Sequence, residues 1–205
     1  MKRIFVTGIS TEVGKTIASA IITEALEADY WKPIQAGDLE HSDSHKIAQM
    51  ISNNNSVIHE NSYALKTPMS PHAAAAIDGI SIQLNKIKEP QTANHLVIEG
   101  AGGLLVPFNE KETILDLIKP NYKVVVVSRH YLGSINHSLL TVGWLKERGF
   151  DISILFSGDE HSTTEEIILS KTGIPCIGRI HEEQNFDVAV IKKYATQFKE
   201  NLMAL

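Results

Sequence analysis

The feature that most constrains this chain lies near its N-terminus, where a short β-branched strand runs into a glycine-bounded loop. The loop ends in Gly14-Lys15-Thr16, and a helical pattern follows it. In this setting, backbone N–H groups at the helix N-terminus bind phosphate oxygens, the lysine neutralises their charge and the threonine hydroxyl suits Mg²⁺. Five residues, rather than the usual four, separate Gly8 from Gly14. We therefore predict a variant phosphate-binding loop with a nucleoside triphosphate as its ligand.

Length, charge and cysteine content narrow the class of protein. A chain of 205 residues has the size of one domain, so we expect residues 1–205 to form a single unit. The 24 acidic residues outnumber the 19 basic ones, which argues against nucleic acid as a partner. Cys176 is the only cysteine, which excludes an intrachain disulfide. No signal peptide or membrane-spanning run is evident, so we expect a soluble, cytoplasmic protein with no membrane partner.

Apolar strand-like runs alternate with helical patterns along most of the chain. This alternation predicts an α/β fold, a three-layer α/β/α sandwich with a mostly parallel sheet of the P-loop NTPase type. The run Val124–Val127 has no polar alternate, as expected of a central strand covered on both faces. Ligands of such sheets bind beyond the carboxyl ends of the strands. Strands are expected at 4–7, 95–99, 123–128, 152–156 and 175–180, and helices after Lys15 and at 42–52, 134–147, 163–172 and 187–202.

Two acidic residues beyond the loop are candidate metal ligands. Glu99 ends an apolar strand and precedes Gly100-Ala101-Gly102-Gly103, where a phosphate-loop enzyme is expected to carry a second metal-binding carboxylate. The glycines allow a ligand to approach the backbone closely. Asp43 is ambiguous by itself, because either Ser42 or Asp43 can cap the helix that follows.

One lysine outside the loop is a candidate for phosphate chemistry. Lys32 follows Tyr30-Trp31 at the end of a probable strand and precedes Pro33, which keeps the backbone of Lys32 extended. A lysine at the end of a strand can face bound phosphates. It can equally lie in solvent, since lysine is seldom buried without a partner.

Six motifs follow one another along roughly the first 140 residues, and their order is far more specific than any one of them. They are Thr11-Glu12-Val13-Gly14-Lys15-Thr16, Lys32-Pro33 with Gly37, Ser42-Asp43, Ser70-Pro71-His72, Glu99-Gly100-Ala101-Gly102-Gly103 and Leu132-Gly133-Ser134-Ile135-Asn136-His137. In this order the motifs resemble those of the dethiobiotin synthetase family.

The resemblance implies an ATP- and Mg²⁺-dependent ligase of biotin biosynthesis, which forms the ureido ring of dethiobiotin from 7,8-diaminononanoate and CO₂. In that family one substrate amine takes up CO₂ as a carbamate, which attacks the γ-phosphate to give a carbamic-phosphoric anhydride. The second amine then closes the ring. A negative carbamate must approach a polyanionic phosphate, so the site has to supply positive charge. The resemblance therefore implies Lys15 and Lys32 as catalytic residues.

The resemblance also implies which residues bind the ligands. Mg²⁺ would be held by the hard oxygens of Thr16, Asp43 and Glu99. Similar proteins bind the substrate carboxylate at a helix N-terminus that is donated across a twofold axis, which implies a homodimer. Substrate contacts are expected from Thr11, Lys32, Ala36, Ser134, Ile135 and Asn136. Nucleotide contacts are expected from Glu12, Val13, Gly14, Lys15, Thr16, Ile17, Asp43, Glu99, Gly100, Ala101 and Gly102.

Two positions depart from the family pattern. Ala36 stands where relatives often carry serine, which removes one side-chain hydrogen bond to the substrate. Gly158 stands where an asparagine usually contacts the edge of adenine. The sequence therefore predicts weak discrimination among bases, so that other nucleoside triphosphates are accepted besides ATP.

An alternative interpretation is a regulatory ATPase of the partition or septum-positioning type, which shares variant phosphate loops and parallel sheets. Such proteins carry an extra lysine early in the loop, and Ser10 occupies that place here. The sequence also shows no terminal amphipathic helix for a membrane surface. Both observations favour the ligase.

Overall fold

A parallel sheet of seven strands forms the centre of the chain, whose computed structural model describes residues 1–205. The strand order is β4-β2-β6-β1-β7-β8-β9, and every neighbouring pair is parallel. The first strand, which carries the phosphate loop, therefore lies between the two halves of the sheet. The strands are β1 (Arg3–Gly8), β2 (Asp29–Trp31), β4 (Ile58–His59), β6 (Leu96–Gly103), β7 (Lys123–Arg129), β8 (Asp151–Ser157) and β9 (Cys176–Ile180).

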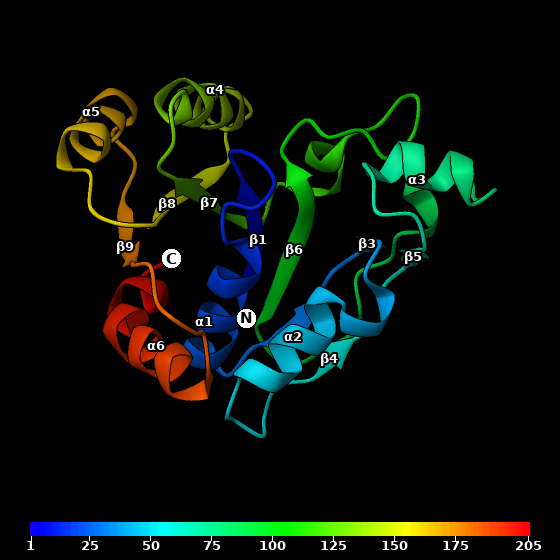
Figure 1. Cartoon of the computed structure of the whole chain (residues 1–205), viewed down its shortest axis with the longest axis horizontal. Helices are drawn as coiled ribbons and strands as arrows, with labels where there is room; N and C mark the ends of the chain where they lie inside the picture. Colours follow the sequence, from blue (N-terminus) through cyan, green and yellow to red (C-terminus); the bar gives the residue numbers. More distant parts are fainter.

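Helices cover both faces of this sheet (Figure 1). One layer contains α1 (Lys15–Leu26), α2 (Asp43–Met50) and α6 (Val188–Met203). The opposite layer contains α4 (Ser134–Glu147) and α5 (Ser162–Thr172). The predicted three-layer α/β/α sandwich is confirmed. The five predicted strands and the five predicted helices are all present, with shifted ends: β6 continues to Gly103, and α2 ends at Met50.

The core lies between the sheet and its two helical layers. Val124–Val127 of β7 are at most 1% exposed, as predicted for a central strand. Strands buried on both faces need no polar alternate, because helices replace water on either side. Burying each such valine stabilises the fold by roughly 1.5–3 kcal/mol before the entropy of ordering the chain is counted.

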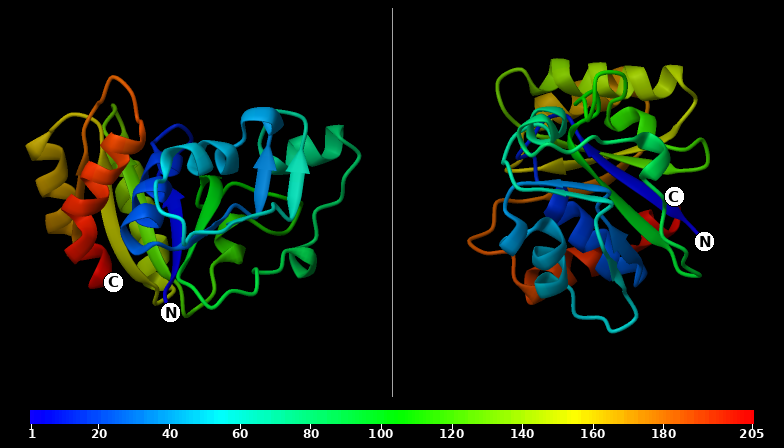
Figure 2. Two further views of the ribbon diagram at one scale, coloured as in Figure 1. Left: turned by 90° about the horizontal axis from the view of Figure 1, so that it is seen from below. Right: turned by 90° about the vertical axis from the view of Figure 1, so that its right-hand side faces the viewer.

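A second sheet of two strands projects from one edge of the molecule (Figure 2, left). It consists of β3 (Ile34–Ala36) and β5 (Tyr63–Leu65), which run parallel and lie beside α3 (Pro71–Ile77). The sequence did not predict this sheet, since three-residue strands give no measurable alternation. Pro33 separates β3 from β2, because proline has no N–H to donate to a ladder. Three short 3₁₀ turns complete the fold: η1 (Leu39–His41), η2 (Leu84–Lys86) and η3 (Ile114–Leu117).

The two ends of the chain lie close together at the amino ends of the strands, opposite the ligand side (Figure 2). The Lys2 ammonium donates to the carbonyl of Met203 at 2.7 Å. None of the helices is long and apolar enough to cross a bilayer.

Gly178 in β9 provides a test of the packing between the sheet and α6. Its φ is +152°, and a Cβ there would lie 2.4 Å from Cε1 of Phe198, which is almost fully buried. We expect Gly178→Ala to destabilise the protein by about 2–4 kcal/mol, because it adds both strain and overpacking. Chemical denaturation measures this change.

Gly143→Ala is the matched control for that substitution. Gly143 lies in α4, and a Cβ there meets no atom within 4 Å. Alanine favours a helix over glycine by roughly 1 kcal/mol, so this variant should be as stable as the wild type or more so. Equal stability of the two variants would contradict the proposed packing of β9 on α6.

Candidate active site

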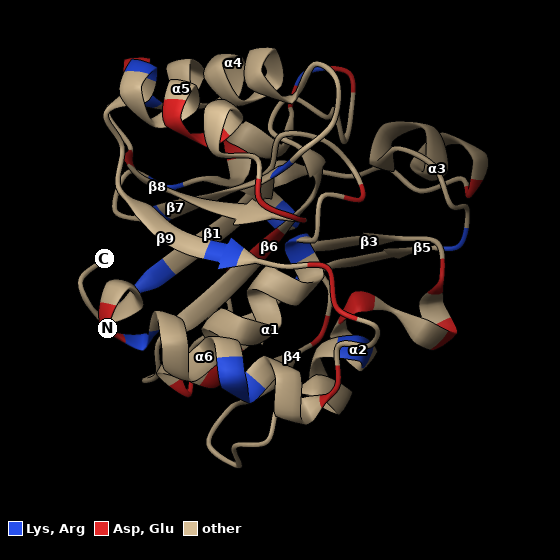
Figure 3. Ribbon diagram, turned by 60° about the vertical axis from the view of Figure 1, so that its left-hand side comes forward, with Lys and Arg blue, Asp and Glu red and all other residues tan.

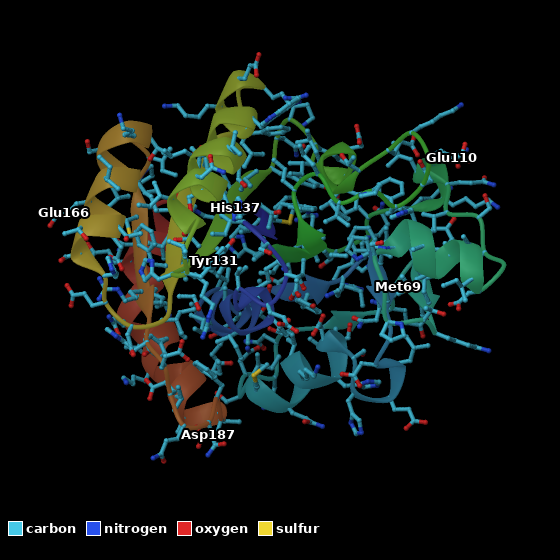
Figure 4. All side chains as sticks on the ribbon, turned by 45° about the horizontal axis from the view of Figure 1, so that its top comes forward. Met69, Glu110, Tyr131, His137, Glu166 and Asp187 are labelled. Atoms are coloured by element: carbon cyan, nitrogen blue, oxygen red, sulfur yellow. The ribbon has the colours of Figure 1, made fainter.

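A cleft of about 1210 Å³ opens at the carboxyl ends of the strands, as the strand-end rule predicts. Its floor is the loop between β1 and α1, and its walls come from both halves of the sheet and from α4. Met69, from the loop before α3, stands across the cleft from His137 of α4 (Figure 4). The cleft therefore has room for a nucleotide and a second substrate together.

The phosphate loop ends in a helix N-terminus whose N–H groups are available to a ligand. Gly14 is the N-cap of α1, has a φ of +92°, and gives the helix no side-chain cap. The left-handed conformation of the backbone explains why glycine stands there. Glu12 also has a positive φ, 55°, although it carries a side chain. Two left-handed residues close together bend the loop into a cradle for an anion.

Lys15 is folded back over this loop. Its ammonium donates to the carbonyl of Ser10 at 3.0 Å, and the residue is 8% exposed. Burial lowers the pKa of Lys15 to about 8, with the positive charge of Lys32 acting in the same direction and Glu99 opposing it. A bound polyphosphate would oppose this shift, since anions favour the charged ammonium.

Lys32 lies between two carboxylates. The buried Lys32 ammonium contacts Asp43 and lies 3.2 Å from Glu99 Oε1. Burial by itself would lower the pKa of Lys32, but the charges and hydrogen bonds of Glu99 and Asp43 outweigh it and raise that pKa. Figure 3 shows the resulting meeting of basic and acidic segments between β6 and β3. The sequence left open whether Lys32 faces bound phosphates or lies in solvent, and the structure places it inside the cleft.

Glu99 is the most deeply buried acid of the cleft, at 1% exposed. Its Oε1 accepts from the Thr16 hydroxyl at 3.0 Å, and its Oε2 accepts from the Tyr30 hydroxyl at 3.0 Å. Burial and the charge of Glu99 raise the pKa of Tyr30, so the phenol stays protonated as a donor. Two hydroxyls and one ammonium thus fix the orientation of this carboxylate.

Asp43 is free to serve the cleft because its neighbour caps the helix. The Ser42 hydroxyl accepts from the backbone N–H of His45 at the start of α2. This resolves the ambiguity left by the sequence. Burial would raise the pKa of Asp43, but the charge and hydrogen bond of Lys32 lower it, so Asp43 is ionised.

The three oxygen-bearing groups suit a small hard cation. Thr16, Asp43 and Glu99 come from α1, α2 and β6 and meet beside Lys32. Mg²⁺ is typically held by one or two carboxylates together with water and substrate phosphates, not by a complete cage of protein ligands. The donor set here has that composition.

Most of the predicted site residues are brought together in the cleft. Twelve of them line it: Thr11, Glu12, Gly14, Lys15, Thr16, Ile17, Lys32, Ala36, Asp43, Glu99, Ala101 and Gly102.

Five predicted residues do not line the cleft of their own chain. Val13 and Gly100 are buried behind it. Ser134, Ile135 and Asn136 belong to the first turn of α4, where the structure shows no side-chain cap. The N-cap is Gly133, so neither Ser134 nor Asn136 caps this helix. Tyr131 and His137 mark this end of the helix in Figure 4.

Sequence reasoning missed several lining residues. Some lie at strand ends, and the rule that predicted Glu99 applies equally to Arg129 of β7 and Ser157 of β8. Others gave no signal, because contacts between distant segments bring them to the cleft. These are chiefly Gln35, Met69, Leu104, Val106, Glu182 and Phe186.

Solved structures share the fold at low sequence identity. The MinD cell division protein of Aquifex aeolicus is 14% identical, with a TM-score of 0.60, and the alignment covers 100% of this chain and 98% of that one. A plasmid partition protein of Borrelia burgdorferi is 14% identical, with a TM-score of 0.59 and coverage of 100% and 99%. At such identity these likenesses show the fold alone, so they do not favour the partition or septum-positioning alternative.

Sequence comparisons are much closer. A family model described as an AAA domain matches residues 2–189. The ATP-dependent dethiobiotin synthetase BioD of Christiangramia forsetii is 60% identical over 202 residues, covering 98% of both chains. The protein of the same name from Cytophaga hutchinsonii is 46% identical over 204 residues, again covering 98% of both. With identity spread over the whole length, the chain belongs to the family of ATP-dependent dethiobiotin synthetases.

Proposed function

We propose that the cleft closes the ureido ring of dethiobiotin from 7,8-diaminononanoate and CO₂, using ATP. As a member of its family the chain is an ATP-dependent ligase that forms dethiobiotin in biotin biosynthesis. One observation carries the detailed proposal: a buried, charged Lys32 lies between Asp43 and Glu99 beside the phosphate loop. This arrangement supplies a fixed positive charge where a carbamate would meet a γ-phosphate.

The chemistry divides into three steps that each need charge control. One amine nitrogen bonds to the carbon of CO₂ and loses a proton, which gives the carbamate. A carbamate oxygen then bonds to the γ-phosphorus while the bond to ADP breaks. The second amine attacks the carbamoyl carbon, loses a proton and displaces phosphate. In the second step two anions approach each other, and Lys32 and Lys15 offset their repulsion.

Thr16, Asp43 and Glu99 would hold Mg²⁺, which when bound supplies positive charge to the phosphates. Lys32 already pairs with both carboxylates, so the chain itself brings these oxygens close together. Thr11 and Glu12, in the loop, and Ala36, at the end of β3, would lie along the diamine.

The carboxylate end of the substrate would bind at α4 of a second copy of the chain. Gly133 leaves the first turn of α4 without a side-chain cap, so the N–H groups of this turn can donate to an anion. Exposed apolar side chains surround this turn and continue along the helix, including Leu132, Leu140 and Trp144. Such a cluster is typical of a surface that another chain covers. We therefore propose a homodimer in which residues 134–136 complete the partner's cleft.

The proposed setting is the cytoplasm. The one cysteine of the chain, Cys176, is unpaired and half-buried, which suits a reducing compartment.

Lys32→Ala tests the catalytic charge. Phosphate release from MgATP that depends on the diamine and bicarbonate should fall at least about 100-fold, because the site loses its main cation for the transfer. Lys46→Ala is the control: its ammonium lies 3.9 Å from the same Asp43, but it is half-exposed, and its loss should change activity less than about twofold. Equal losses in the two variants would contradict a special role for Lys32.

The lowered pKa of Lys15 predicts proton uptake when the triphosphate binds. Without a ligand the Lys15 ammonium has a pKa of about 8, and bound phosphates raise that pKa. At pH 8.5 roughly 0.8 proton should be taken up, and ATP affinity should fall as pH rises through 8, because the free ammonium loses its proton. Calorimetry in two buffers of different ionisation enthalpy measures the uptake. Lys15→Gln should abolish it, and unchanged uptake in that variant would assign the proton elsewhere.

Mixing two inactive variants tests the shared site. Lys32→Ala disables its own cleft, and Asn136→Asp places a negative charge where the substrate carboxylate would bind. In a mixed dimer, one cleft combines a native Lys32 with a native α4. An equal mixture after subunit exchange should therefore regain about a quarter of wild-type activity. No recovery, in a mixture shown to contain mixed dimers, would place the carboxylate site within one chain.

A further inference from the structure

One part of the cleft lies away from Lys32, over the carboxyl ends of β7, β8 and β9. Arg129 ends β7, Ser157 ends β8 and Glu182 follows the end of β9 by two residues. The register of the sheet places Arg129 beside Ser157, and Ser157 beside Ile180. All four of these residues line the cleft, so the three strand ends form one wall of it.

Arg129 and Glu182 are joined across the end of β8. Arg129 Nη2 donates to Glu182 Oε1 at 2.6 Å, and both side chains remain partly exposed. Gly158 lies beneath this pair, since a Cβ on Gly158 would be 3.4 Å from the same Oε1. The other carboxylate oxygen, Oε2, receives no hydrogen bond from the chain. A carboxylate therefore occupies the space above Gly158, with one oxygen free to accept.

The distribution of charge indicates which end of a nucleotide reaches this wall. Lys32, Asp43 and Glu99 gather on the β2 and β6 side of the phosphate loop, so the reacting phosphate belongs there. On the other side the loop packs directly against β8, where a Cβ on Gly14 would lie 2.9 Å from Ser157 Oγ. A nucleotide with its phosphates on the loop therefore extends its base over β7, β8 and β9.

The wall offers both kinds of contact that a base needs. The half-buried Phe186, which packs on the core that contains Ile180, provides apolar contact for the plane of the ring. Glu182 provides a polar group that can reach the edge of the ring. This combination of an apolar slot and one oriented polar group is typical of sites that select a ligand.

We propose that Glu182, held in position by Arg129, recognises the 6-amino group of adenine. The inference rests on the proposed function, because it assigns ATP to the same cleft. A carboxylate only accepts hydrogen bonds and the amino group donates them, whereas guanine presents a carbonyl oxygen that the carboxylate repels. Glu182 is then a specificity-determining residue and Arg129 a positioning residue. Glu182 would supply the base contact that Gly158, having no side chain, cannot make.

The test compares ATP with purine riboside triphosphate, which carries hydrogen in place of the 6-amino group. Affinities of the two nucleotides are measured by displacement of a fluorescent nucleotide, and kcat/KM values by diamine-dependent phosphate release. The wild type should favour ATP by about 10- to 100-fold, the usual effect of a hydrogen bond to a charged group. In Glu182→Ala the ratio should fall to about 1–3, because no acceptor remains.

Three further variants separate recognition from a structural role. Glu182→Gln keeps an acceptor oxygen and should give an intermediate ratio, while Arg129→Met should lower the ratio by freeing the carboxylate to move. Glu183→Ala is the matched control. The Glu183 carboxylate pairs with Lys193 and Tyr194, outside the cleft, so its removal should leave the ratio at the wild-type value. If the ion pair between Arg129 and Glu182 were merely structural, its loss would change the affinities for both nucleotides equally. The ratio of ATP to purine riboside triphosphate would then be the same in every variant.

Two results would overturn the inference. One is a wild type that treats both nucleotides alike, as the weak discrimination predicted from Gly158 would require. The other is a preference for ATP over purine riboside triphosphate that is as large in Glu182→Ala as in the wild type. Failure of the proposed function gives a different result, since no triphosphate would then support diamine-dependent phosphate release, while the binding ratios would still decide the role of Glu182.

Discussion

The pairing of Lys32 with Asp43 and Glu99 is the interaction on which the rest of the active site depends. It joins the end of β2, the first turn of α2 and the middle of β6, segments that are distant in the sequence. A buried ammonium or carboxylate without a partner costs several kcal/mol, and removing one partner of such a pair typically costs about 3–5 kcal/mol. The three groups are therefore held in place before any ligand arrives. This preorganisation is what an electrostatic catalyst requires, because the dipoles and charges need no rearrangement during the reaction.

Much of this arrangement could be predicted from local sequence. The phosphate loop follows from the strand, the glycines and the helix around Lys15, and Glu99 follows from its place where an apolar run gives way to glycines. Pro33 explains why Lys32 is extended and not helical, which directs attention to that residue. Asp43 shows the limit of local reasoning, since its pattern is also that of a helix cap. Only the structure shows that the Ser42 hydroxyl makes the cap and leaves the carboxylate to the cleft.

Other features could not be predicted, because they arise from contacts between distant segments. Arg129 and Glu182 are 53 residues apart, and nothing in either local sequence indicates the other. Their contact depends on the register between β7, β8 and β9, which is set by burial of whole strands. The small sheet of β3 and β5 was missed for a related reason. Each of its strands has three residues, and their pairing is decided by the path of the chain around Pro33.

Fold and function separate clearly in this chain. Its sheet is shared with cell-division and partition proteins at 13–14% identity, so the scaffold by itself does not determine the activity. The distinction lies in what the strand ends carry. On one side of β1 the pair of carboxylates around Lys32 suits a substrate that becomes negatively charged before phosphate transfer. On the other side the carboxylate of Glu182 faces the space for the base.

Because β1 and its loop lie between the two sides, one bound triphosphate contacts both, and the two ends of the cleft can vary independently. The absence of a side chain at Gly158 can therefore be offset on its own side of the sheet without disturbing the charges that surround Lys32.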